Sequence, residues 1–123
     1  MSNKKLAVIM DPIQNIKPHK DSSLAMLLEA QKRGFEIYCG DLADIWLDGA
    51  VPRGRLTQLK VFDDSTIWFE VVDPVEFDLG DLDVILMRKD PPFDIQYVFS
   101  TYVLEQAERR GTLIVNRPQG LRD

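Results

Sequence analysis

The sequence predicts an α/β fold in which a mainly parallel sheet carries helices on both faces, with an antiparallel excursion in the middle of the chain. Residues 6–39 show a strand, helix, strand pattern, and residues 83–116 show the same order again. Residues 41–81 between them carry a hairpin signal and alternating polar and apolar side chains. A right-handed crossover makes the two strands of each unit parallel, with the helix packed on the sheet. We therefore expect three layers.

The first unit begins with a continuous apolar run at residues 6–10, which has the length of a buried strand. Asp21 or Ser22 can cap the helix that follows, and Gly34 suits the left-handed residue that ends it. The next strand is predicted at residues 35–39. The helix side chains expected to face the sheet are Leu24, Ala25, Met26, Leu27, Leu28 and Ala30.

The middle of the chain changes character. Asp48 and Gly49 lie between two apolar stretches and predict a hairpin turn. Residues 56–61 and 66–72 alternate polar and apolar side chains, which is typical of exposed strands. We assign this part to an antiparallel edge or excursion.

The second unit resumes the α/β order. A strand is predicted at residues 83–87, Asp94 can cap a helix that runs to Arg110, and Gly111 ends it. Residues 113–116 form the last predicted strand. The apolar stripe expected on this helix consists of Val98, Tyr102 and residues 104–107.

Composition excludes several classes of protein. The chain has 123 residues, of which 45% are hydrophobic and 28% charged, as in an ordinary globular domain. Its net charge of −5 argues against a nucleic-acid or anionic-membrane surface. No apolar run is long enough to cross a bilayer and the first residues contain no secretory signal, so a cytoplasmic location is expected. The only cysteine is Cys39 and the only histidine is His19, so neither a disulfide nor a thiolate or histidine metal site is expected.

The most informative charges follow the strand predicted at residues 83–87. Arg88 and Lys89 supply two cations and Asp90 an acceptor. Pro91 and Pro92 then restrict the backbone, so these charges lie on a stiff loop. The plainer alternative is a solvated strand end before a helix.

Three polar loops, each containing proline, leave the carboxyl ends of predicted parallel strands, at residues 11–20, 88–93 and 116–120. In open parallel sheets ligands bind beyond these ends. The first loop leads to Ser22 and Ser23 at a helix N-terminus, which favours an anion, although plain capping is the alternative there. No glycine precedes Gly34, so the turn after the first strand cannot be a phosphate cradle.

Four blocks of the chain are distinctive in order and content. They are residues 10–12, 20–34, 82–94 and 116–123. Together they closely resemble the N-terminal domain of prokaryotic glutathione synthetase, and the match is weakest between residues 43 and 80. The resemblance implies a pre-ATP-grasp fold in which residues 1–123 form one substrate domain. The residues after Pro118 have the character of a linker into a further part of the protein.

The family also implies an ATP-grasp module downstream, which this sequence lacks. The glycine-rich loop that covers phosphate and the acidic magnesium ligands of the family lie in that module. We therefore expect no cofactor, no catalytic residue and no metal site in residues 1–123, Mg-ATP in the full-length enzyme, and no activity from this part alone.

The reaction of the family joins γ-glutamylcysteine and glycine through an acyl phosphate, and it needs oriented carboxylates. The helix N-terminus with Arg88 or Lys89 is expected to hold a carboxylate, and Asp11 or Asp90 to meet the ammonium. The full list of candidate substrate-binding residues is Asp11, Asp21, Ser22, Ser23, Arg88, Lys89 and Asp90. Two alternatives remain: a non-catalytic α/β module that binds a small acidic metabolite or a partner protein, and a subunit-contact domain in a homo-oligomer.

Overall fold

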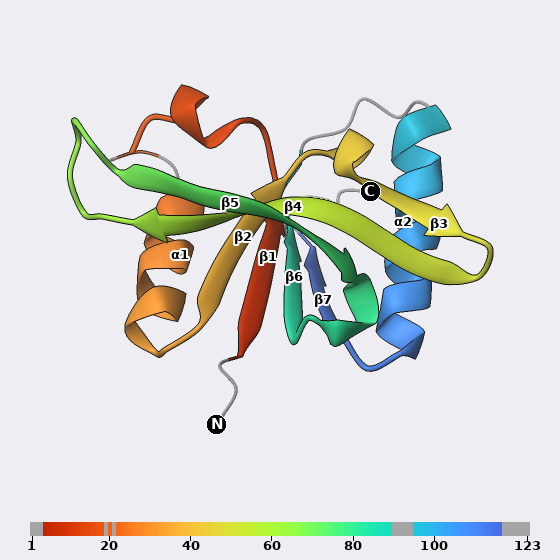
Figure 1. The fold of residues 1–123 in the computed structure, drawn as a ribbon. Coiled ribbons are helices and arrows are strands. Elements are labelled where there is room, and N and C mark those ends of the chain that lie inside the picture. The colour runs from red at the N-terminus through yellow and green to blue at the C-terminus, as the bar shows by residue number, and fades with distance from the viewer. Residues whose placement is uncertain (1–3, 19, 21, 90–94, 117–123) are drawn as a thin grey trace.

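The computed structural model describes residues 4–18, 20, 22–89 and 95–116. Within this part of the chain, two helices and seven strands form an α/β fold (Figure 1). The strands are β1 Lys5–Ile9, β2 Glu36–Gly40, β3 Ile45–Asp48, β4 Val51–Val61, β5 Phe69–Asp78, β6 Val84–Met87 and β7 Leu113–Asn116. The helices are α1 Ser22–Lys32 and α2 Ile95–Arg109, and short 3₁₀ turns lie at η1 Ile13–Asn15, η2 Leu42–Asp44 and η3 Leu79–Asp81.

Four strands are parallel, as the two strand, helix, strand units predict. β1 pairs with β2 on one side and with β6 on the other, and β6 pairs with β7. Each unit ends its helix with a glycine at positive φ, Gly34 at 93° and Gly111 at 107°. A left-handed residue of this kind lets the chain turn back onto the sheet without the strain that a Cβ atom would add.

The excursion is antiparallel, also as predicted. β3 and β4 form a hairpin around Gly49, whose φ is 64°. The long strand β4 then pairs with β2 and, along its other side, with β5. The excursion therefore extends the sheet beyond β2 and crosses in front of it (Figure 1).

The two helices lie on opposite sides of the parallel strands, which confirms three layers (Figure 1). Leu6 and Val8 of β1 face α1 and pack with Leu27. Ala7 and Ile9 face the other way, into the core that contains the α2 side chains. This alternation follows from the two-residue period of a strand. Neither described helix has the length and apolar character that a membrane crossing requires.

Several predictions about helix faces are wrong. Ala25 and Met26 of α1 are exposed rather than packed on the sheet. On α2 the predicted Val98 and Tyr102 are exposed, whereas the predicted Leu104 and Ala107 are buried. The buried set is Ser100, Val103, Leu104 and Ala107. Ser100 is buried although its side chain is polar, so a prediction from hydropathy leaves it out. The predicted apolar stripe is therefore rotated around the helix relative to the buried face.

Candidate functional site

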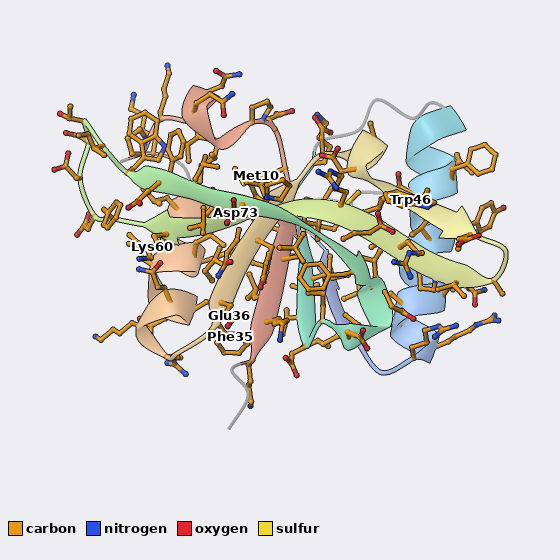
Figure 2. All side chains as sticks on the ribbon, in the orientation of Figure 1. Met10, Phe35, Glu36, Trp46, Lys60 and Asp73 are labelled. Carbon is orange, nitrogen blue, oxygen red and sulfur yellow. The ribbon has the colours of Figure 1, made fainter. Side chains whose placement is uncertain are left out.

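The carboxyl ends of three parallel strands meet at one edge of the sheet. The amide of Met10 donates to the carbonyl of Gly40 at 2.9 Å, and the amide of Arg88 donates to the carbonyl of Ile9 at 2.8 Å. These bonds continue the strand ladders of β1, β2 and β6 by one residue. Met10 lies at this edge, whereas Phe35 and Glu36 lie at the opposite end of the sheet (Figure 2).

Lys89 joins these three strand ends. Its Nζ lies 2.6 Å from Oδ1 of Asp11, which follows β1, and 3.1 Å from Oδ1 of Asp41, which follows β2. The hydrogen bond with Asp11 is the main cause that raises the pKa of Lys89, although burial opposes it. The lysine is therefore charged at neutral pH, and its ammonium group already has two carboxylate partners.

Arg88 turns to the other side, toward the start of α1. Its Nε donates to Oγ of Ser23 at 3.2 Å, and a terminal guanidinium nitrogen donates to Oγ of Ser22. Ser23 is buried, which fixes one end of this contact. Both the guanidinium group and the N-terminus of a helix attract anions. This corner of the site is therefore suited to a carboxylate.

A polar pocket of about 620 Å³ opens at this corner. Arg88, Ser22 and Ser23 line it together with the loop after β1, which adds Lys17 and Lys20. A second, smaller pocket of about 220 Å³ lies on the other side of residues 10–12, and Asp41 and Cys39 line it. Asp11 borders both pockets. The rim of the larger pocket therefore carries the carboxylate of Asp11 together with the three cations Lys17, Lys20 and Arg88.

The structure brings together five of the seven residues that the sequence singled out. They are Asp11, Ser22, Ser23, Arg88 and Lys89. Asp21 and Asp90 lie outside the described residues, as do His19, the proline pair and most of the loop predicted at residues 116–120. The described contacts give the two cations different positions, because Lys89 is held by Asp11 whereas Arg88 contacts Ser23 and lines the polar pocket.

Sequence reasoning missed Asp41. It directly follows β2, so the rule that parallel strand ends share one edge could have found it. Lys17 and Lys20 were within a predicted loop but were not singled out. Among the described residues, no group of three His, Cys, Asp or Glu side chains is arranged to hold a metal ion.

Cys39 lies at the end of β2, beside the smaller pocket. The thiol is partly buried rather than fully enclosed. Burial, with a smaller contribution from the Asp44 carboxylate, raises its pKa to about 11. The side chain is therefore a neutral thiol at physiological pH, and thiolate chemistry is disfavoured there.

Comparison with known proteins identifies the family of this chain. Residues 5–122 match the family described as prokaryotic glutathione synthetase, N-terminal domain. The chain is 56% identical over 119 residues to the glutathione synthetase of Pseudomonas aeruginosa, 54% identical to that of an Escherichia coli strain, and 51% identical to that of Pseudomonas syringae pv. tomato. These matches cover 97% of this chain but only 37–38% of each relative. The chain belongs to the family of prokaryotic glutathione synthetase N-terminal domains.

Proposed function

We propose that this chain is the substrate-binding N-terminal domain of a glutathione synthetase, the ligase that uses ATP to join γ-glutamylcysteine and glycine. Family membership and relatives that are named glutathione synthetase support the proposal. Because the chain spans just over a third of those relatives, the activity is proposed for a longer protein and not for residues 1–123 alone.

The chemistry divides the work between the parts of such an enzyme. ATP phosphorylates the cysteinyl carboxylate, and the glycine amine then attacks the acyl phosphate to give glutathione, ADP and phosphate. The proposal places Mg-ATP and the reacting phosphate in an ATP-grasp module outside these residues, because the turn after β1 has no glycine for a phosphate cradle. The role left to this domain is to hold the peptide substrate in a fixed orientation. A cytoplasmic location remains part of the proposal.

The observation that carries the proposal is the position of Arg88. Its guanidinium group lies against the first residues of α1 and lines the polar pocket beside Lys17 and Lys20. We assign a carboxylate of γ-glutamylcysteine to this corner, because a guanidinium group binds a carboxylate through charge-assisted hydrogen bonds. Lys89 has a different role, since it holds Asp11 and Asp41 in place.

The ammonium group of the substrate is assigned to Asp11. This carboxylate is the more exposed partner of Lys89, with 64% of its side chain accessible against 39% for Asp41. It also faces the pocket that Arg88 lines. Asp11 therefore places a carboxylate at the rim of the pocket that contains the cations, while its Oδ1 stays bonded to Lys89.

The proposal is tested by assaying the longer protein and residues 1–123 in parallel with γ-glutamylcysteine, glycine and Mg-ATP. We expect glutathione and ADP from the longer protein only, with ADP release dependent on both amino-acid substrates. A longer protein that binds γ-glutamylcysteine but forms no glutathione would favour the alternative, a non-catalytic module for small acidic metabolites. Glutathione formation by residues 1–123 alone would contradict the division of work.

A further inference from the structure

One face of the parallel strands is only partly covered by the described elements. On the α1 side, the helix packs over β2 and β4. The register places Leu113 of β7 beside Val84 and Val115 beside Leu86, so these side chains share the face that α1 covers elsewhere. Leu113 is nevertheless 58% exposed and Val115 37% exposed. Parallel sheets are normally covered on both faces, so this end of the sheet lacks its cover within the described residues.

A shallow groove of about 510 Å³ lies between α1 and the strands, and it reaches Leu86, the residue that pairs with Val115. It is lined mainly by apolar residues of α1, β1 and β6, among them Met26, Leu6 and Leu86. Met26 is 38% exposed although it belongs to a helix that packs on the sheet. We call the groove together with Leu113 and Val115 the open face. Contiguous exposed apolar surface of this kind marks an interaction site more often than a random surface does.

The open face is small. It comprises the eight residues that line the groove together with Leu113 and Val115. Stable complexes between separate proteins use roughly 20 to 30 residues on each side. A covalently joined partner needs much less, because a short tether gives an effective concentration of about 1 mM or more. The size of the open face therefore fits a tethered partner better than a second copy of this chain.

We propose that the open face binds the carboxyl-terminal part of the glutathione synthetase to which this domain belongs, and that this part covers Leu113 and Val115 with an apolar surface. The inference rests on the proposed function. The family match runs to residue 122, and the relatives are much longer than this chain, so in them the rest of the enzyme continues from close to β7. β7 is also the edge strand of the parallel part, where a following segment can approach without crossing another strand.

The test introduces a single reporter cysteine into the longer protein, at Leu113→Cys or, as a control, at Phe62→Cys. Both parent side chains are exposed in the described part of the chain, at 58% and 39%, and Phe62 directly follows Val61, the last residue of β4. The native Cys39 is expected to react only slowly with the maleimide, because the pKa of its thiol is raised to about 11. We expect a maleimide to react with Leu113→Cys at least tenfold more slowly than with Phe62→Cys. Equal rates would overturn the proposal.

Two further measurements separate the alternatives. Residues 1–123 are expected to sediment as a monomer, and a concentration-dependent dimer that Leu113→Lys dissociates would overturn the proposal in favour of a second copy. Labelling needs no catalysis, so protection of Leu113→Cys in a protein that forms no glutathione would support the covered face while the proposed function failed.

Discussion

Nζ of Lys89 lies 2.6 Å from Oδ1 of Asp11, although 78 residues separate them in the sequence. The contact ties the carboxyl end of β6 to that of β1, and Asp41 adds the end of β2 at 3.1 Å. A single ammonium group therefore fixes the spacing of three strand ends at the edge that we assign to substrate.

Removing this ammonium group is expected to loosen the edge. Lys89→Met leaves two carboxylates close together without their cation. We therefore expect the free energy of unfolding, measured in urea, to fall by about 1 kcal/mol, which is the upper end of the range for exposed ion pairs. Arg109→Ala is the control, since Arg109 is 68% exposed and, among the described residues, pairs with Glu105 of its own helix; its cost should be about 0.3–0.5 kcal/mol. Equal costs would show that Lys89 does not hold the strand ends.

The stability difference between the parent and Lys89→Met depends on pH with a definite sign. The pKa of Lys89 is raised in the folded protein, chiefly by the hydrogen bond with Asp11. The stability that the raised pKa contributes is fully present below the pKa of the unfolded lysine, and is lost as the pH rises through the folded value. We therefore expect the difference between the parent and Lys89→Met to stay constant from pH 7 to pH 9. A loss of the difference within this range would contradict the raised pKa.

The buried face of α1 gives a second prediction. Leu27 is fully buried, so Leu27→Ala is expected to cost about 2 to 5 kcal/mol of stability. Lys32→Ala should cost less than about 0.5 kcal/mol, because that side chain is exposed. Met26→Ala is a closer control, since it shortens a large apolar side chain on the neighbouring position that is 38% exposed. Similar urea midpoints for Leu27→Ala and Met26→Ala would mean that the helix faces are assigned wrongly.

Cys39 gives a third prediction, on thiol reactivity. With a pKa of about 11, only about one thiol in a thousand is ionised at pH 8, so a disulfide reagent should react far more slowly with the folded chain than with the chain in urea. Asp44→Asn should speed the reaction in the folded chain, because the Asp44 carboxylate helps to raise the pKa. A folded-state rate as fast as that in urea would contradict the raised pKa.

The sequence predicted the α/β order well because its signals are local. Gly34 and Gly111 end the two helices as expected, and β7 spans the predicted residues. β5 begins at Phe69 rather than at residue 66, because the Asp64 side chain accepts hydrogen bonds from the amides of Thr66 and Ile67. That turn holds both residues out of the strand, and hydropathy patterns do not register it.

The site was only partly predictable for a physical reason. The rule that parallel strand ends share an edge placed Asp11, Arg88 and Lys89 together, but it could not say which carboxylate each cation meets. Asp41 was missed because it opens the excursion, in which the sequence shows no chemistry. Its contact with Lys89 depends on the pairing of β1 with both β2 and β6, which is a long-range property of the fold.

The central claim is that Arg88 binds a carboxylate of γ-glutamylcysteine, and kinetics of the longer enzyme carrying Arg88→Ala test it most directly. Loss of a charge-assisted contact worth about 1.5 to 3 kcal/mol should raise the Michaelis constant for γ-glutamylcysteine at least about tenfold. The constant for ATP should barely change, the far-UV circular dichroism spectrum should remain that of the parent, and Arg109→Ala, at an exposed position of α2, should leave both constants unchanged. Arg88→Ala kinetics identical to those of the parent, or a variant that unfolds, would contradict the claim.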